Sequence, residues 1–474
     1  MAARDLHDGG ASGVLFTDRR NFYIDPQVVK ELWTDVTPFT TVIANKETRN
    51  VPDPIFKMFE HRQPWVEQLF YSTDAVTTAA GALSASQGID DGAGGVAYKG
   101  LPNGGSVSDL SPMLGLICEV WASADYAAKT GVPKGTMLIS TIESVSGSGA
   151  EIKMYNIGNA AITGANNDVY VVTGNAHGEG GYSPEAWADE LKIVYNSCQI
   201  FKNPLEITGT LLEASLRGES SELARLRMQK SQEHKIHKER AFLFGRRNGG
   251  TGLGESAYAD GLIGANVDET FADDGVAGAA YAGAHTGTSG SGAGKVRTTF
   301  GILPAILKYG ASSGDNQNYF TASEASYTYS NFVDDMEKVF QYVPTSGVKK
   351  AFVGAGALGY WSKMAGNSGF AGNNGWTVNL SDMKRDTLGF NYRTLETPHG
   401  MLQMIPTPAL RGPWSKSMLI VDDDNLFHSQ YRAPMYQTNI KTDNAYDGIK
   451  DQYMSDEGIG ITNINSHSLI KITA

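Results

Sequence analysis

Two stretches far apart in the chain, each rich in apolar residues, predict strands that we expect to pair as a long hairpin. They run from Ile55 to Glu60 and from Glu190 to Phe201. Between them, Gly, Asn and Ser turn signals separate four further candidate strands at the spacing of small barrels or sandwiches, namely Leu116–Trp121, Thr136–Ile142, Glu151–Tyr155 and Asp168–Val172. A β-rich insertion domain is therefore predicted at about residues 108–175, after a Gly/Ala/Ser/Thr-rich linker from about Ala75 to Ser108.

A helical pattern replaces the strand signals from Ser220 to Phe244. Ser220 is suited to cap this helix, Glu222 lies in its first turn and Gly245 ends it. At 1.5 Å per residue the helix is expected to be roughly 37 Å long. Its apolar residues are too sparse for a full core-facing stripe, and basic residues crowd the rest of it: Arg225, Arg227, Lys230, Lys235, Lys238 and Arg240. Such a helix usually bridges between bodies.

The chain after this helix predicts a loop followed by a mixed domain. Residues from Arg246 to Lys295 are rich in Gly, Ala, Ser and Thr and are expected to form surface loop instead of core. Beyond them we predict a helix capped by Ser330 and a second helix from Ala355 to Met364. Short strands are predicted at Lys349–Val353, Phe390–Leu395, Met401–Ile405 and Met418–Val421. This mixture predicts the α+β class, with antiparallel strands.

The N-terminal stretch predicts an arm. Asp25 and Pro26 can open a short amphipathic helix within Phe22 to Lys46, and Thr37-Pro38-Phe39 is expected to end it. The spaced prolines of Val51-Pro52-Asp53-Pro54 favour extended backbone. Residues 1–10 carry charges where a secretion signal needs an apolar run, and no run of about 18 apolar residues occurs. Neither a signal peptide nor a transmembrane helix is expected.

Composition narrows the class of function. Of the 474 residues, 19% are charged and 41% are hydrophobic, which is a globular mixture, and the length allows two or three packed regions. A net charge of −12 repels phosphate backbones and argues against a dedicated nucleic-acid binder, although a container for DNA can be acidic. Cys118 and Cys198 lie in no CxxC pair, so we expect two buried thiols.

No motif carries chemistry in the context that the chemistry requires. Gly252–Ala257 matches the dinucleotide fingerprint G-x-G-x-x-A but follows a predicted helix where a strand is needed. His234 and His237 could touch one metal ion, yet no further ligand is indicated by spacing. Gly294-Lys295 fails as a P-loop, and no nucleophile motif occurs. We therefore expect no catalytic, cofactor-binding or metal-binding residues, and no enzyme.

The order of the predicted parts resembles the tailed-bacteriophage major capsid family. Its HK ninety-seven-type fold has an N-terminal arm, an extended loop, a peripheral domain with a long spine helix, and an axial domain. The segments that carry the resemblance are, in chain order, Thr37–Thr40, Ile55–Glu60, Leu205–Thr210, Glu222–Gly245, Phe332–Tyr360 and Tyr453–Ile472. The insertion between Ser108 and Gly174 departs from the minimal family pattern.

The resemblance implies five regions along the chain. These are an N-terminal arm at residues 1–53, an extended loop with the β-rich insertion domain at 54–203, a peripheral domain with spine helix 220–244 and a Gly-rich loop at 204–300, an axial domain at 301–427, and a C-terminal return to the peripheral domain at 428–474. The Gly-rich joints at 81–99 and 249–294 are expected to act as hinges.

The resemblance also implies a major capsid protein that assembles with itself, in pentamers and hexamers, into the icosahedral head of a tailed phage. This head encloses double-stranded DNA without sequence-specific binding. The virion capsid is expected to assemble in the host cytoplasm, with separate scaffolding, portal and decoration proteins as further partners and no membrane. Arg62, Arg225 and Arg227 are candidate intersubunit contacts to carboxylates of a neighbour, with intramolecular or solvated arginines as the alternative.

Two other readings of the sequence stay open. One is a nanocompartment shell of the same fold, which would enclose protein cargo in place of DNA. The other comes from a different class of protein: a monomeric hydrolase or carbohydrate-binding protein with a β-sandwich module at Ser108–Gly174. The size of the particle formed by the purified chain separates the second alternative from the shell.

Overall fold

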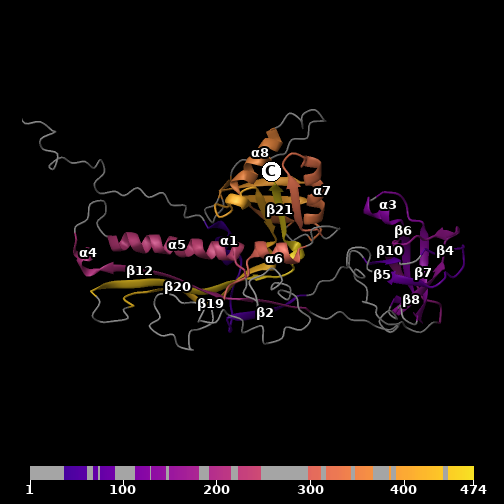
Figure 1. Cartoon of the computed structure of the whole chain (residues 1–474), viewed down its shortest axis with the longest axis horizontal. Helices are drawn as coiled ribbons and strands as arrows, with labels where there is room; N and C mark the ends of the chain where they lie inside the picture. Colours follow the sequence, from indigo (N-terminus) through magenta and orange to yellow (C-terminus); the bar gives the residue numbers. More distant parts are fainter. Residues whose placement is uncertain are drawn as a thin grey trace, which may run out of the picture. The chain divides into compact units, whose positions relative to one another are not determined.

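The computed structural model divides the chain into two compact units, residues 1–60 with 192–474 and residues 61–191. Figure 1 labels their helices and strands. The structure describes residues 37–60, 68–72, 75–90, 113–128, 130–145, 149–180, 192–214, 222–246, 297–310, 317–342, 347–366, 384–385, 391–440 and 447–473. The whole Gly-rich segment predicted at 249–294 and residues 1–36 of the predicted arm lie outside these residues.

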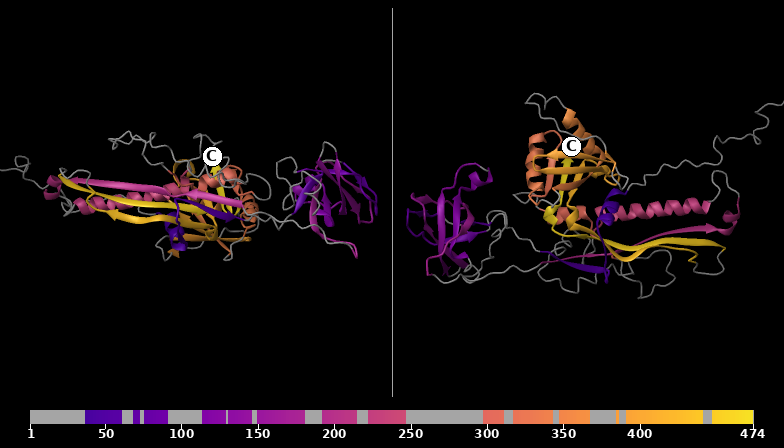
Figure 2. Two further views of the ribbon diagram at one scale, coloured as in Figure 1. Left: turned by 90° about the horizontal axis from the view of Figure 1, so that it is seen from below. Right: turned by 180° about the vertical axis from the view of Figure 1, so that it is seen from behind.

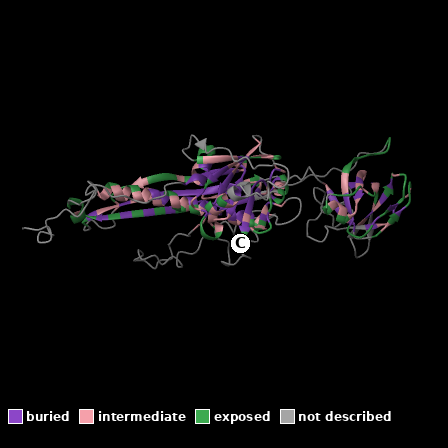
Figure 3. Cartoon of the chain, turned by 90° about the horizontal axis from the view of Figure 1, so that it is seen from above, coloured by how far each residue is buried: buried purple, intermediate pink, exposed green. Residues whose placement is uncertain are grey.

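An elongated four-stranded sheet, with one long helix packed on it, forms one part of the first unit. The sheet has the order β1 (Thr48–Asn50), β19 (Leu426–Gln437), β20 (Gly448–Ile461) and β12 (Gln199–Thr208). Buried and exposed side chains alternate along β12, because one face of this sheet is covered (Figure 3). The covering element is α5 (Glu222–Phe244), which runs along β12 and β20 (Figure 2). The long helix predicted from Ser220 to Phe244 is confirmed over these residues.

A seven-stranded sheet forms the other part of this unit. Its order is β13 (Tyr319–Ser323), β21 (Ser468–Thr473), β18 (Ser417–Val421), β14 (Val348–Val353), β17 (Gly400–Pro406), β16 (Asn391–Thr397) and β15 (Lys384–Arg385). The pairs β13–β21 and β14–β17 are parallel, so the prediction of antiparallel strands is wrong for these two pairs. Each needs a connection through distant chain, which local patterning does not reveal.

Both faces of the seven-stranded sheet are covered. Helices α7 (Tyr329–Val339) and α8 (Ala355–Gly366) contribute to a core with one set of strand residues, such as Ile420. The alternate strand residues, such as Leu419, belong to a second core that includes α6 (Ile302–Tyr309) and the C-terminal end of α5. Thr328 caps α7 by accepting from the backbone of Asn331, so the cap lies two residues before the predicted Ser330.

A short helix and a hairpin follow the N-terminal region. The helix α1 (Pro38–Lys46) begins where the sequence predicted a helix to end, because Pro38 occupies the first turn, where its missing N–H costs nothing. The hairpin pairs β2 (Ile55–Glu60) with β11 (Lys192–Ser197) in antiparallel register and confirms the predicted pairing. The predicted strand from Glu190 to Phe201 is two strands, since the chain passes at Cys198 from β11 into β12.

The second unit is a closed β-barrel. Its strands follow the order β10 (Val169–Asn175), β3 (Leu69–Ser72), β5 (Gln87–Asp90), β8 (Gly149–Asn156), β7 (Gly135–Val145) and β6 (Leu116–Trp121). A small pair, β4 (Thr77–Thr78) with β9 (Ile162–Thr163), and a short helix, α3 (Ser123–Ala127), complete the described elements. Phe70 and Tyr170 stack in the core with ring centroids 5.1 Å apart.

The sheet topology corrects three of the predicted regions, two in the barrel and one near the C-terminus. The insertion domain begins before residue 108, because β3 and β5 belong to the barrel. The supposed linker from Ala75 to Ser108 therefore contains β4 and β5, although its residues from 91 onward lie outside the described chain. The predicted C-terminal return at 428–474 is also divided, since β20 joins the four-stranded sheet and β21 joins the seven-stranded sheet.

Candidate assembly surfaces of the first unit

A row of polar pairs fixes α5 on its sheet. Arg227, His234 and Lys238 lie seven and four residues apart and so share one face of the helix. Each contacts a polar residue of β20: Arg227 Nη2 lies 2.8 Å from Asp451 Oδ2, His234 Nε2 lies 2.9 Å from Ser455 Oγ, and Lys238 Nζ lies 3.1 Å from Glu457 Oε2. This explains why apolar residues on the helix are sparse: much of its inward face is polar. The long helix predicted to bridge between bodies is instead bonded along its own sheet.

The two carboxylates of this row are held in the charged form. The Asp451 side chain is fully buried and accepts hydrogen bonds from the Tyr436 hydroxyl, the Asn439 backbone N–H and Arg227. Burial opposes its ionisation, but these donors outweigh burial and lower the pKa of Asp451 below its usual value. Glu457 behaves alike, since contacts with His428 and Lys238 overcome burial and lower its pKa. Removing one cation would therefore leave a buried anion without its compensation.

His234 is the neutral member of the row. Burial, with the positive charge of Lys238 as a smaller contribution, lowers the pKa of His234 to about 4. Its Nδ1 lies 2.9 Å from the Asn203 side-chain oxygen, so we assign the proton to Nδ1. Nε2 then accepts from the Ser455 hydroxyl. The imidazole thus links two strands, β12 and β20, beneath the helix.

A second contact ties α5 to the start of α1. The Glu239 carboxylate is buried and accepts from the backbone N–H groups of Phe39 at 3.1 Å and Thr40 at 2.7 Å. Burial raises the pKa of Glu239 although these hydrogen bonds oppose the rise. The first turn of a helix leaves backbone N–H groups unpaired, so Glu239 acts as a cap supplied from another helix. The end of the predicted N-terminal arm is thereby anchored to α5.

The sequence-predicted contact arginines fall into different settings. Arg225 pairs with Glu222 one turn away on the same helix, and Arg227 pairs with Asp451 of its own chain. Arg62 lies outside the described residues. The structure thus gives two of the three an intramolecular partner, and their role between subunits stays a prediction. The residues that sequence reasoning missed are the partners, Glu239, Asp451 and Glu457, because long-range pairing has no local signature.

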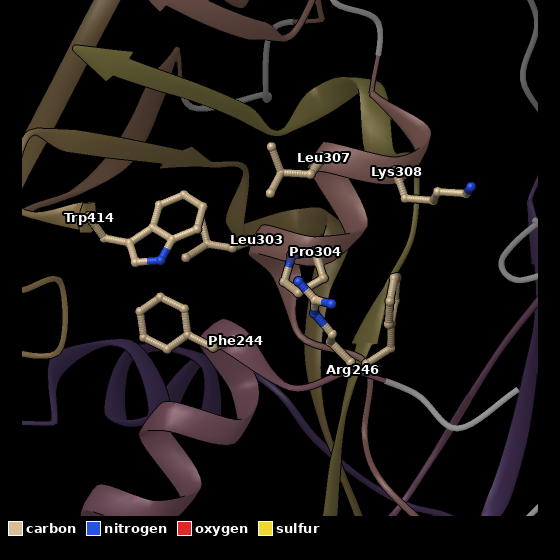
Figure 4. Close-up of a pocket in the computed structure, with 8 residues that line it drawn as sticks. Phe244, Arg246, Leu303, Pro304, Leu307, Lys308 and Trp414 are labelled. Carbon is tan, nitrogen blue, oxygen red and sulfur yellow. The ribbon is translucent and has the colours of Figure 1, made fainter. Parts of the chain in front are cut away.

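An apolar pocket lies where α5 ends. Its volume is about 510 Å³, and Figure 4 shows side chains from α5, α6 and the turn η6 (Gly412–Trp414) converging on it. The lining consists of six apolar and two basic residues: Phe244, Phe300, Leu303, Pro304, Leu307, Trp414, Arg246 and Lys308. Phe244 and Trp414 have ring centroids 6.0 Å apart, and Lys471 Nζ lies 4.7 Å from the Trp414 ring centroid. The pocket therefore suits an apolar group accompanied by negative charge.

Other candidate chemistry has a structural explanation. His234 is held by Asn203 and Ser455, and the described residues contain no group of three His, Cys, Asp or Glu side chains placed to hold a metal ion. Cys118 and Cys198 are buried free thiols, and burial raises the pKa of Cys198 to about 12. No helix in the described part of the chain is long and apolar enough to cross a membrane.

Comparisons with known proteins agree with a shell protein. Residues 27–474 match the family model described as SU10 major capsid protein. Among solved structures, the chain is similar to the capsid of a native GTA particle at 9% identity, covering 98% of this chain and 99% of that chain with a TM-score of 0.39. It is similar to Mycobacterium phage Patience at 12% identity, covering 64% of this chain and 78% of that chain with a TM-score of 0.35. The search of curated proteins finds no match.

Because these TM-scores are low, the family match is the finding that decides. A match across both units defines a capsid protein, which builds a shell from copies of itself. The chain belongs to the SU10 major capsid protein family. The predicted capsid function and α+β class are confirmed, and the division of the chain into arm, extended loop, peripheral domain and axial domain stays a prediction. A monomeric hydrolase or carbohydrate-binding protein is not favoured.

Proposed function

We propose that the chain tiles in pentamers and hexamers into the icosahedral head of a tailed phage that encloses double-stranded DNA. The observation that carries this proposal is the family match over residues 27–474, which takes in both units. In a closed shell each contact can be modest, since many copies of the contact act together. The polar row beneath α5 supports the proposal because it fixes the long helix to its own sheet. The helix and the sheet can then contact neighbouring copies as one rigid element.

We propose that the protein works without catalysis, cofactor or metal. Its buried titratable groups serve structure: fully buried Lys349, for example, donates to the backbone oxygens of Val339 at 2.7 Å and Ser466 at 2.8 Å. Burial lowers the pKa of Lys349 to about 8. Two carbonyl partners fix this amine between two segments of the chain, which favours a structural role over a reactive one.

The partners follow from the same proposal. A net charge of −12 suits a lining that encloses DNA without gripping its backbone or reading its sequence. Scaffolding, portal and decoration proteins would be separate chains, and assembly would take place in the host cytoplasm. A nanocompartment shell of the same fold would differ from this head by enclosing protein cargo in place of DNA.

Size-exclusion chromatography with negative-stain microscopy tests the proposal. The chain is expressed alone and together with a separate scaffolding protein, and we expect megadalton polyhedra. Extraction of nuclease-protected DNA from particles made during infection distinguishes a phage head from a nanocompartment, which would yield protein cargo. A monomer of about 51 kDa under every condition would contradict the shell.

The candidate intersubunit arginines form part of this proposal. Reversing the charge at Arg62 and Arg225 together is expected to raise the concentration needed for assembly, because neighbours would lose up to about 1 kcal/mol per exposed pair. Arg227 is left unchanged in this test, because it also holds the buried Asp451 carboxylate of its own chain. Reversal at Lys235 and Arg240, which lie exposed on the same helix, is the matched control. Equal effects in both variants would reject a specific role for these two arginines.

A further inference from the structure

Two surfaces of complementary character lie at opposite ends of α5. The helix α4 (Gly209–Glu213) lies beside the start of α5, and the pocket lies at its end, next to α6 (Figure 1). The 23 residues of α5 place these ends about 35 Å apart at 1.5 Å per residue. Both ends belong to one compact unit, so one molecule cannot bring them together.

The first surface is an apolar and acidic tip. Leu211 and Leu212 are 38% and 37% exposed, so both side chains reach the surface of this short helix. Glu213 follows them, and the Asp447 carboxylate packs against the start of the helix at Gly209, where a Cβ atom would collide with it. Neither Glu213 nor Asp447 has an ion pair among the residues that the structure describes. The tip therefore offers two apolar side chains flanked by two negative charges.

The second surface is the pocket, with the opposite charge. Its floor is apolar, Leu307 is 41% exposed, and the exposed side chains of Arg246 and Lys308 stand at its rim. A volume of about 510 Å³ falls within the range of about 300–1,000 Å³ that typical binding sites occupy, and so admits two leucine side chains.

We propose that the α4 tip of one copy docks into the pocket of a second copy. Leu211 and Leu212 enter the apolar part, and Glu213 and Asp447 face the cations at the rim. This inference rests on the proposed shell function and names one of its contacts. Because the two surfaces differ, the contact is heterologous: it joins copies head to tail and closes into a ring only if the rotation between copies allows it.

Removing the apolar pair tests the contact by assembly. The double variant Leu211→Ser/Leu212→Ser changes exposed positions, so its thermal unfolding should match that of the parent chain. We expect at least a tenfold rise in the concentration needed to form particles. Met228→Ser is the matched control, since Met228 is 64% exposed on α5 between the two ends. An unchanged assembly threshold in the double variant would overturn the contact.

A charge exchange tests the rim. Glu213→Lys alone is expected to weaken assembly, and combining it with Arg246→Glu should restore part of the loss, because the exchanged pair again carries opposite charges. Failure of the combined variant to assemble better than Arg246→Glu alone would count against the predicted pairing.

Cross-linking distinguishes this contact from the shell function. Leu212→Cys and Leu307→Cys are prepared separately, mixed, assembled and oxidised; the native thiols Cys118 and Cys198 are buried. Disulfide-linked dimers in mixed particles, absent from either variant alone and from a mixture of Met228→Cys with Leu307→Cys, support the contact. Mixed particles without such dimers overturn it and leave the shell function intact. A parent chain that forms no particles defeats the proposed function, and this inference with it.

Discussion

Glu239 accepts two hydrogen bonds from Thr40, one from its backbone N–H and one from its hydroxyl, both at 2.7 Å. The residues are 199 positions apart in the sequence. A carboxylate near the C-terminal end of α5 thus completes the first turn of α1, which has no side-chain cap of its own at Thr37. The position of the chain that enters from the N-terminal region therefore depends on a side chain of the long helix.

Truncating this cap should destabilise the first unit. We expect Glu239→Ala to lower the free energy of unfolding by about 3 kcal/mol, since it leaves buried N–H groups without an acceptor. Thr40→Val removes only the hydroxyl and should cost about 1 kcal/mol. Urea unfolding of both variants measures the difference, and equal losses would show that the backbone contacts to Glu239 contribute nothing.

Two arginines on one helix provide a matched comparison of ion pairs. Arg227→Met deprives the fully buried Asp451 carboxylate of its cation and should cost about 3 kcal/mol. Arg225→Met breaks the partly exposed pair with Glu222 within the helix, for which the expected cost is about 0.5 kcal/mol. Chemical denaturation compares the two losses. A cost for Arg225→Met that equals the cost for Arg227→Met would contradict the importance of burial.

Mild acid should weaken the first unit through its buried histidines. The pKa of His234 is about 4 in the folded chain and about 6.5 when unfolded, so between these values the unfolded chain binds the extra proton. The contribution of His234 to the free energy of unfolding is fully present above pH 6.5. It decreases as the pH falls toward 4, by up to about 3 kcal/mol. His467, whose pKa burial lowers to about 3, adds to the loss.

The measurement is the melting temperature at several pH values between 7 and 4.5, where Asp451 and Glu457 remain ionised because their pKa values are lowered. His234→Gln should reduce the slope of melting temperature against pH. His237→Gln, at a half-exposed position one turn away, is the control. A slope unchanged by His234→Gln would exclude its contribution.

The barrel has its own core, so its stability should change separately. Phe70→Ala removes a fully buried ring that stacks on Tyr170 and should cost about 4 kcal/mol. Calorimetry should then show a lower transition for residues 61–191 and an unchanged transition for the first unit. A shift of both transitions would mean that the two units unfold together.

The sequence predicted those elements whose period is carried by their own residues. The strand from Leu116 to Trp121 has the predicted bounds, and α5 ends at Phe244 as expected. The strands β3 and β5 were missed because they are only four residues long and take part in the barrel through pairing with distant strands. The parallel pairs of the seven-stranded sheet were missed for the same reason.

The assembly surfaces show the same limit. The basic residues of α5 were visible in the sequence, but which of them turn inward depended on acids more than two hundred positions away, such as Asp451. The spacing of Arg227, His234 and Lys238 was the available signal, and it was overlooked because helix faces are usually sought by apolar residues. The pocket at Trp414 joins three separate segments and has no counterpart in any one of them.

The closed barrel has a consequence for crowding. Strands at the rim of an open sheet expose backbone N–H and C=O groups to which another chain can add, and a shell holds its subunits at very high local concentration. In a sheet that closes on itself, these groups pair with the neighbouring strand and are not accessible to another chain. Many such modules could therefore be packed side by side without polymerising through the strand edges of their barrels.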